Sequence, residues 1–312
     1  MQIVFLDEAT LGKMAATEKI ASLGEYIAYD FTSPEDVSKR VKDADVIITN
    51  KVYISKELMS SLKRLKLICV AATGMNNVDL KGAAELGIVV KNVAGYSTAS
   101  VTQTTFALLL QLMSKVSCFD KYVKDGSYAA SNSFTKIDPS YDELAGKVFG
   151  VVGLGTIGKS VAGVAKAFGA EVIYYSTSGA NNNSDYRRVD MSELLSKSDV
   201  ISIHAPLNEN TNNLFDYKEL SQMKPTSIII NMGRGGIINE AALARVIDEG
   251  KIGGAALDVF TKEPILNENP LSNIKNKERV AFTPHIAWAS LQARERLMEL
   301  LYQNIINWQK SI

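Results

Sequence analysis

Three spaced glycines are the residues whose spacing most clearly suits an anionic ligand. They occur in Gly153–Gly158, which reads GLGTIG and lies between the apolar run Val148–Val152 and a segment with helical periodicity. The first glycine permits a tight turn, the second lets the backbone approach a pyrophosphate, and the third lets the helix pack closely on the strand. Unpaired N–H groups at the helix start favour an anion. The segment predicts a dinucleotide-binding turn, with a plain glycine-rich connection as the alternative.

Polar side chains follow the other apolar runs in the same part of the chain. In order they are Ser176-Thr177, His204, Gly233-Arg234, Asp258 and His285. In an open α/β sheet, ligands bind outside the carboxyl ends of the strands, so we expect these groups to converge on one edge. The chain has two histidines and both fall at this edge. Because imidazole titrates near neutral pH, each is a candidate for proton transfer.

Short apolar runs that alternate with helical patterns predict parallel sheets covered by helices. In the first part of the chain the expected strands are Gln2–Leu6, Tyr26–Tyr29, Val46–Thr49, Leu67–Ala71 and Ile88–Val90. In the second part they are Val148–Val152, Glu171–Tyr175, Val200–Ile203, Ser227–Asn231, Gly254–Leu257 and Val280–Thr283, six in all as in a dinucleotide fold. The fold class expected is α/β, with two doubly wound parallel-sheet domains, one flavodoxin-like and one of the Rossmann type.

Capping residues predict where several helices begin. Ser33-Pro34 is typical of an N-cap followed by proline at the first helical position, and Ser55 is placed to cap Lys56–Leu62. Ser100 and Gln103 form a capping-box pattern ahead of a long helix, Val101–Ser117. Residues Asp125–Tyr141 have little periodicity and predict an extended arm. Packing on a second subunit and a simple solvated loop are both open for this arm.

The length of 312 residues suggests two domains. We expect residues 1–96 and 288–312 to form a substrate-binding domain, to which the C-terminal helix Leu291–Gln309 returns, and residues 97–287 to form the dinucleotide-binding domain. The hinges expected between them are Asn92–Ser97 and Ala287–Leu291.

Composition excludes several classes of partner. Lys and Arg together number 34, as do Asp and Glu, so nothing indicates nucleic acid or a membrane surface. The start, MQIVFLDE, has no basic region or long apolar stretch, which indicates a first strand and no signal peptide. Cys69 and Cys118 stand in apolar contexts without metal-ligand spacing, so we expect buried reduced thiols, no metal and a cytoplasmic location.

Five motifs together resemble the D-isomer-specific 2-hydroxyacid dehydrogenases. They are GLGTIG, HAPLNENT (His204–Thr211), NMGRGGIINE (Asn231–Glu240), ALDVFTKEP (Ala256–Pro264) and TPHIAW (Thr283–Trp288). The similarity covers essentially the whole chain, including ATGMNNVDL (Ala72–Leu80) and NVAGYST (Asn92–Thr98). HIAWAS and the segment TNK (Thr49–Lys51) are most similar to the glycerate dehydrogenase/hydroxypyruvate reductase branch.

The resemblance implies Arg234, Glu263 and His285 as the catalytic set. His285 would protonate the carbonyl oxygen as hydride reaches C2, and in reverse would take the hydroxyl proton. Glu263 would favour the charged imidazolium and fix the orientation of the ring. Arg234 would hold the substrate carboxylate in its planar fork and polarise the carbonyl. Taken singly, the three residues have other possible roles. Arg234 could be a loop residue that contacts a phosphate, Glu263 a solvated acid before a proline, and His285 a histidine buried in the core.

The resemblance also implies which residues contact the ligands. Asp258 would bond the nicotinamide carboxamide, with a helix cap as the alternative. The cofactor contacts are Gly153, Leu154, Gly155, Thr156, Ile157, Gly158, Ser176, Thr177, His204, Ala205, Pro206, Thr211, Met232, Gly233, Arg234, Asp258 and His285. The substrate contacts are the backbone of Thr73, Gly74, Met75 and Asn76, with Arg234 and His285, and with Lys51 and Trp288 as pocket walls.

One position departs from the family pattern. NAD-preferring members usually carry an acid after the second strand of the dinucleotide fold, where it bonds the ribose 2′-hydroxyl. Here that position is Ser176, followed by Thr177 and Ser178, and the nearest arginines are Arg187 and Arg188. The cofactor is therefore NAD(H) or NADP(H), and a dual-specific enzyme is a reasonable expectation.

The resemblance implies a cytoplasmic, homodimeric reductase of small 2-keto acids, with glyoxylate and hydroxypyruvate favoured and glycerate in the reverse direction. Formate, phosphoglycerate and D-lactate stay open as substrates within the family. The alternative from another class is a catalytically silent NAD(H)-sensing interaction protein of the corepressor type. This chain keeps all three residues of the catalytic set, which favours the enzyme.

Overall fold

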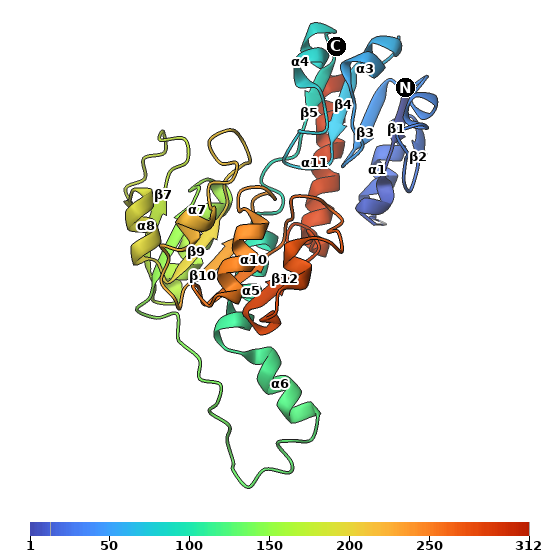
Figure 1. Ribbon diagram of the computed structural model, residues 1–312. Helices are drawn as coiled ribbons and strands as arrows, with labels where there is room; N and C mark the ends of the chain where they lie inside the picture. Colours follow the sequence, from blue (N-terminus) through green and yellow to red (C-terminus); the bar gives the residue numbers. More distant parts are fainter. Residues whose placement is uncertain (13, 312) are drawn as a thin grey trace. The chain divides into compact units, whose positions relative to one another are not determined.

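The computed structural model describes residues 1–12 and 14–311 and divides into two compact units (Figure 1). Unit 1 comprises Met1–Ser97 and Trp288–Ile312, and unit 2 comprises Thr98–Ala287. Each unit is built on one parallel sheet with helices on its faces, which confirms the expected fold class. None of the helices in the described part of the chain is both long and apolar enough to cross a membrane.

Unit 1 holds a five-stranded parallel sheet in the order β2-β1-β3-β4-β5. The strands are β1 Gln2–Phe5, β2 Glu25–Ala28, β3 Val46–Thr49, β4 Leu67–Val70 and β5 Val89–Lys91. One face packs on α1 (Ala16–Ala21) and α11 (Leu291–Gln309), which contributes Leu297, Leu301 and Trp308 to the core. The other face packs on α2 (Val37–Arg40), α3 (Lys56–Ser61) and α4 (Leu80–Glu85). A short 3-10 helix, η1, spans Glu8–Thr10.

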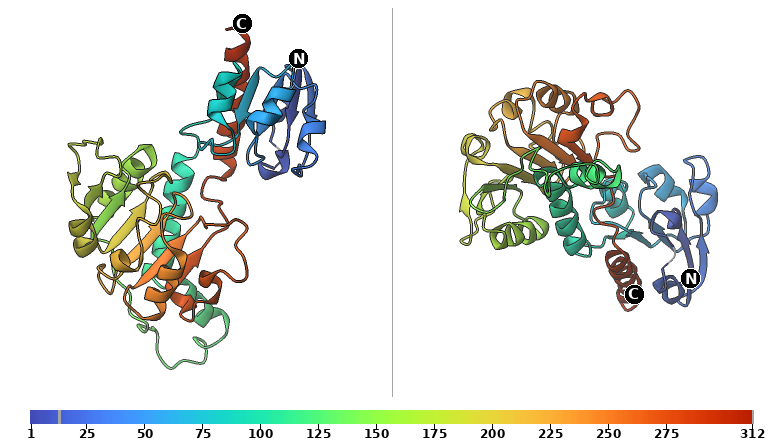
Figure 2. Two further views of the ribbon diagram at one scale, coloured as in Figure 1. Left: turned by 45° about the horizontal axis from the view of Figure 1, so that its top comes forward. Right: turned by 90° about the horizontal axis from the view of Figure 1, so that it is seen from below.

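Unit 2 holds a seven-stranded parallel sheet in the order β12-β11-β10-β9-β6-β7-β8 (Figures 1 and 2). Its strands are β6 Val148–Val152, β7 Glu171–Tyr175, β8 Arg187–Arg188, β9 Val200–Ile203, β10 Ile228–Asn231, β11 Gly254–Leu257 and β12 Val280–Phe282. One face packs on α5 (Thr98–Met113) and α7 (Thr156–Ala167). The other packs on α8 (Met191–Lys197), α9 (Tyr217–Leu220) and α10 (Glu240–Asp248). The 3-10 helices η2 (Pro270–Asn273) and η3 (Lys277–Arg279) precede β12.

All predicted strands are confirmed, with ends within one residue of the expected ones. The prediction of six strands in unit 2 is wrong by one, because β8 is added at the edge of the sheet. This strand is two exposed arginines, so it carries no apolar signal that a sequence pattern could detect.

Two of the three predicted helix starts are wrong. Helix α2 begins at Val37, and Ser33 instead opens a turn that precedes the helix, in which its carbonyl accepts the Asp36 N–H at 3.1 Å and its hydroxyl donates to Asp36 Oδ2 at 3.1 Å. Helix α5 begins at Thr98, so Ser100 lies in its first turn and its hydroxyl donates to the Ala287 carbonyl at 2.6 Å. The cap at Ser55 is confirmed, since its side chain accepts the Leu58 N–H at 3.2 Å.

The segment after α5 differs from the expected single long helix. Lys115 has a φ of 53°, and this left-handed residue separates α5 from a second helix, α6 (Val116–Lys124). No residue of α6 is buried, so the prediction that both thiols are buried is wrong for Cys118, which lies on α6 and is exposed. Cys69 is buried in β4, and burial raises the pKa of its thiol to about 12.

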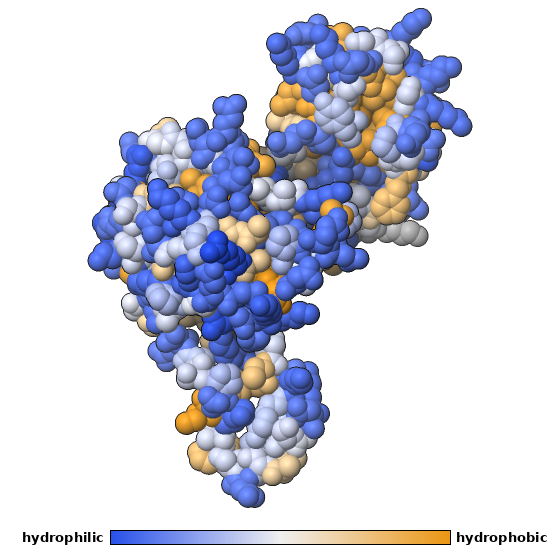
Figure 3. All heavy atoms as spheres, in the orientation of Figure 1, coloured by the Kyte–Doolittle hydropathy of each residue, from blue (hydrophilic) through white to orange (hydrophobic). Residues whose placement is uncertain are grey.

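Residues Asp125–Tyr141 form the expected irregular arm, without a helix or strand. The arm and α6 extend from the rest of unit 2 as one loop (Figure 1). Apolar side chains on it are open to solvent, since Phe134 is 91% and Ile137 81% exposed, and Figure 3 shows such hydrophobic groups on its surface. Exposed apolar patches of this kind are typical of surfaces that bind a partner.

Candidate active site

The glycine turn between β6 and α7 is shaped so that two of its glycines are required by packing. Gly153 has a φ of +88°, and a Cβ there would lie 2.9 Å from the Ala205 nitrogen. A Cβ at Gly158 would lie 2.2 Å from the Gly153 carbonyl oxygen. Gly155 caps α7 with extended backbone, and a Cβ there would meet no described atom within 4 Å. The space beside Gly155, at the start of a twelve-residue helix, therefore fits the pyrophosphate of a dinucleotide.

Replacing Gly155 with alanine is expected to weaken dinucleotide binding by about tenfold, because the new methyl group occupies the space that a pyrophosphate would fill. The apoprotein should unfold at the wild-type temperature, since the backbone conformation at residue 155 suits alanine. Gly163→Ala on α7 is the matched control, because its Cβ would also meet open space. Titration of both variants with NADH and NADPH checks the prediction, which equal affinities would contradict.

His204 directly follows β9 and is partly buried. Its Nε2 lies 2.8 Å from Ser202 Oγ, and its buried Nδ1 has no hydrogen-bond partner among the described residues. Burial lowers the pKa of the ring to about 3, so this histidine is neutral at physiological pH. It is therefore unsuited to proton transfer. The neighbouring Ala205 packs against Gly153, and the buried Thr211 donates its hydroxyl to the Pro206 carbonyl at 2.7 Å.

The lowered pKa of His204 predicts a specific acid dependence of stability. The unfolded chain takes up a proton on this ring below about pH 6.5, whereas the folded chain does not until about pH 3, so stability is lost as pH falls through that window. Between pH 7 and pH 5 the wild type should lose about 2 kcal/mol more unfolding free energy than His204→Asn. Urea unfolding at equal protein concentration measures both losses. Equal losses would show that the folded protein protonates His204.

Arg234 lies in a loop after β10 that is braced by Asn231. The Asn231 side chain accepts the Gly233 N–H at 3.0 Å and donates to the Arg234 carbonyl at 2.9 Å. The guanidinium donates from Nη1 to the Gly233 carbonyl at 2.8 Å. A Cβ at Gly235 would lie 2.0 Å from the Phe260 carbonyl, so this loop packs directly on the segment that leads to Glu263. Asn231 is therefore a site residue that the sequence motifs did not single out.

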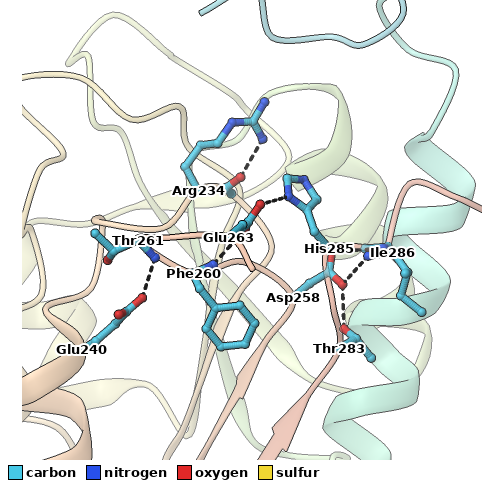
Figure 4. Close-up of polar contacts among 11 residues, drawn as sticks. Arg234, Glu240, Asp258, Phe260, Thr261, Glu263, Thr283, His285 and Ile286 are labelled. Atoms are coloured by element: carbon cyan, nitrogen blue, oxygen red, sulfur yellow. Dashed lines mark hydrogen bonds and ion pairs between the residues drawn. The ribbon is translucent and has the colours of Figure 1, made fainter. Parts of the chain in front are cut away.

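Glu263 and His285 form a close pair at the same edge of the sheet (Figure 4). Nδ1 of His285 lies 2.6 Å from Oε2 of Glu263, and the Phe260 N–H donates to Oε1 at 2.9 Å. The two side chains are 22% and 33% exposed, so solvent reaches the pair. Because a carboxylate can only accept, it holds the proton on Nδ1 and leaves Nε2 as the atom that exchanges protons with a ligand. In Figure 4, Glu263 lies between the Arg234 backbone and the His285 ring.

Asp258 organises the backbone that carries His285. Its buried carboxylate accepts the Thr283 hydroxyl at 2.6 Å and the N–H groups of Ile286 at 2.8 Å and Ala287 at 2.9 Å. Burial raises the pKa of this carboxyl. His285 itself has a φ of 55°, a left-handed conformation that is uncommon outside glycine and that these contacts maintain. The arrangement assigns Asp258 a bracing contact with residues 283–287 beside its expected role toward the carboxamide.

The remaining expected substrate contacts lie in unit 1. The loop Thr73–Asn76 is tied down by the Thr73 hydroxyl, which donates to Val93 O, and by Asn92, which donates to Thr73 O. The N–H groups of Gly74, Met75 and Asn76 donate to none of the described residues. Lys51 lines a 630 Å³ hollow with Asp7, which accepts its backbone N–H at 2.6 Å. Trp288 packs edge-on against Tyr96.

Comparisons with known proteins agree on one family. The model of the D-isomer specific 2-hydroxyacid dehydrogenase NAD binding domain matches residues 106–287. A hydroxypyruvate reductase of Blautia hydrogenotrophica is 38% identical over 311 residues, covering 98% of this chain and 96% of the relative. A glycerate dehydrogenase of Methylorubrum extorquens is 35% identical over 306 residues, covering 97% and 95%.

Solved structures point the same way. An acyclic imino acid reductase in complex with NADPH and D-Arg superimposes with a TM-score of 0.89 at 32% identity, covering 100% of this chain and 98% of the other. The D-lactate dehydrogenase of Aquifex aeolicus with NAD and lactic acid gives a TM-score of 0.84 at 28% identity, covering 99% and 96%.

Proposed function

The chain belongs to the D-isomer-specific 2-hydroxyacid dehydrogenase family, and we propose that it reduces small 2-keto acids, with glyoxylate and hydroxypyruvate favoured and glycerate in reverse. It is an oxidoreductase that uses a nicotinamide cofactor and acts on the CH–OH group of 2-hydroxyacids. The observation that carries the finer proposal is a difference between the two histidines. The pKa of His204 is lowered to about 3, so its ring is neutral, and its buried Nδ1 has no partner among the described residues. His285 has a 22% exposed side chain and is paired with Glu263.

His285 is proposed to move the proton in the reaction. The bound nicotinamide supplies the hydride that reaches C2 of the keto acid. Glu263 accepts a hydrogen bond from the Nδ1–H of His285, so the proton on Nδ1 stays in place. Nε2 is therefore the atom that protonates the carbonyl oxygen, and in the reverse direction it accepts the hydroxyl proton. The carboxylate also stabilises the ring orientation and the positive charge of the imidazolium.

Arg234 is proposed to bind the substrate carboxylate and to polarise the carbonyl. Its guanidinium is planar and permanently charged, which suits a bidentate contact with a carboxylate. The bracing by Asn231 and the contact of Gly235 with Phe260 hold the backbone of this loop beside the Glu263 segment. A rigid backbone lowers the entropy lost when the guanidinium orders on the substrate.

In unit 1 the backbone of Thr73–Asn76 is proposed to bind an anionic group of the substrate. Successive N–H groups without a protein acceptor form a concavity that suits an anion, and three such groups occur here among the described residues. Lys51 and Trp288 are proposed as walls of the substrate pocket.

The cofactor is proposed to be NAD(H) or NADP(H), held by the glycine turn with Ser176 and Thr177 at the ribose, and with Ala205, Pro206, Met232 and Asp258 along the rest of the molecule. We further propose a homodimer in which the arm of residues 125–141 packs on the second subunit. Its exposed phenylalanine and isoleucine support that assignment, because contact with a second chain would remove them from water.

Steady-state assay of the full chain with a panel of 2-keto acids tests the function. We expect the highest kcat/KM with glyoxylate or hydroxypyruvate, and lower values with pyruvate and branched-chain keto acids. If none of the keto acids in the panel leads to oxidation of NADH or NADPH, the proposed reductase activity is wrong. That result would support the silent, NAD(H)-sensing alternative. Size-exclusion chromatography with light scattering tests the dimer.

A further inference from the structure

The segment that follows β7 carries hydroxyl and amide groups and no acid. Residues 176–183 read STSGANNN, so no carboxylate stands where a dinucleotide would place the 2′ position of its adenosine ribose. We propose that Arg188, on the neighbouring strand β8, binds the 2′-phosphate of NADP(H) together with the hydroxyls of Ser176, Thr177 and Ser178. This inference rests on the dinucleotide site proposed above.

Asn181 folds this segment back onto the glycine turn. Its side-chain amide donates to the Leu154 carbonyl at 2.7 Å, and its backbone N–H donates to Ser176 Oγ at 3.3 Å. The Tyr174 hydroxyl donates to the Asn181 carbonyl at 3.1 Å and accepts the Asn183 N–H at 3.0 Å. The segment is therefore held against the glycine turn, whose space at the start of α7 would take the pyrophosphate.

The register of β8 decides which of its two arginines can reach this segment. Arg187 pairs with Ile173 and Arg188 with Tyr174, so the two side chains leave the strand on opposite faces. Arg187 is engaged elsewhere, because its guanidinium lies 2.5 Å from Glu193 and 3.9 Å from Glu171. Arg188 instead donates to the Asn182 side chain at 3.1 Å.

The guanidinium of Arg188 is available for a phosphate. Its Nη2 lies 3.9 Å from the point where Gly179 would carry a Cβ. The positive charge therefore lies close to the segment of residues 176–183, which has no acidic residue. Within the described ranges 1–12 and 14–311, Arg188 takes part in no ion pair. A planar guanidinium and a cluster of hydroxyl donors match the oxygens of a phosphate, and no carboxylate in the turn repels it.

Calorimetric titration of the full chain with 2′,5′-ADP and with 5′-ADP tests the assignment, because the two nucleotides differ in the 2′-phosphate. We expect the wild type to bind 2′,5′-ADP about ten- to a hundredfold more tightly, the range of a charge-assisted contact. Arg188→Gln should remove most of that preference and leave the affinity for 5′-ADP within about twofold of wild type. The preference should also shrink with added salt, since the site is exposed.

Arg187→Gln is the matched control, and we expect it to retain the preference for 2′,5′-ADP. Ser176→Asp is a second variant that introduces the missing carboxylate, and it should reverse the preference towards 5′-ADP. An unchanged preference in Arg188→Gln, or an equal loss in Arg187→Gln, would overturn the role of Arg188. A wild type that binds 5′-ADP at least as well as 2′,5′-ADP would also overturn it, whereas binding of neither nucleotide would refute the dinucleotide site itself.

Discussion

Replacing His285 with asparagine is expected to lower kcat for keto-acid reduction by roughly 10²- to 10⁴-fold, the usual contribution of a positioned acid–base group. Asparagine is the replacement to use because residue 285 has a left-handed backbone, with a φ of 55°, which asparagine tolerates better than alanine does. The amide cannot give up a proton, so the carbonyl oxygen must be protonated from solvent. Steady-state assays with glyoxylate and hydroxypyruvate measure the loss.

The control for this variant is binding of the reduced cofactor. Fluorescence titration with NADH or NADPH should give affinities within about twofold of wild type. The proposed role of His285 is proton transfer, so its replacement should slow the chemical step and leave cofactor binding nearly unchanged. A parallel loss of binding and turnover would mean that His285 shapes the cofactor site and does not transfer the proton. Turnover close to that of wild type would remove it from the reaction altogether.

Replacing Arg234 with lysine is expected to raise KM for the keto acid by about a hundredfold, with a smaller fall in kcat. The charge is kept, but an ammonium cannot make the two parallel contacts with a carboxylate that a guanidinium makes. The variant loses the bond from the guanidinium to the Gly233 carbonyl, but Asn231 still holds the backbone of residues 233 and 234, so the loop should keep its conformation. The Ki of oxamate, a carboxylate analogue of the substrate, should rise in parallel with KM.

Arg245→Lys provides the comparison for this second variant. Arg245 lies on α10, is exposed and pairs with Glu249 at 2.7 Å, so its replacement should leave KM, kcat and the oxamate Ki at wild-type values. If Arg234→Lys behaves like Arg245→Lys, the carboxylate is bound elsewhere. A fall in kcat with KM unchanged would indicate that Arg234 polarises the carbonyl without holding the carboxylate.

Local patterns were sufficient to predict the sheets of both units. Strands such as β6 and β9 are short apolar runs between helical segments, and each was predicted with its observed ends. The signal is local because burial on both faces of a parallel sheet demands a continuous apolar run. It fails for β8, whose two residues are exposed arginines, and for the start of α5, where Ser100 lies inside the helix and bonds Ala287.

The candidate site could be predicted only in part, because local patterns identify residue types but not the contacts that the folded chain makes. The residue types of the family motifs select Arg234, Glu263 and His285, whose roles stay predictions, and the structure brings Glu263 and His285 into contact. The sequence pattern could not reveal that Asn181 bonds the glycine turn or that Asn231 braces the arginine loop. The Asn181 contact joins residues 27 positions apart, whose approach depends on how the sheet is assembled. The Asn231 contacts reach only residues 233 and 234, and they depend on the backbone conformation that this loop adopts after β10.

By itself, then, the sequence determined the two parallel sheets, the glycine turn and the acid-free segment after β7, because each depends on neighbouring residues and on local backbone geometry. The tertiary structure alone decided which histidine is kept neutral by its surroundings, which arginine of β8 contacts the segment of residues 176–183, and what the Asp258 carboxylate contacts. Burial and strand register arise from contacts between residues far apart in the chain, such as Asp258 with residues 283–287 and Arg188 with Tyr174, and these become visible only after folding.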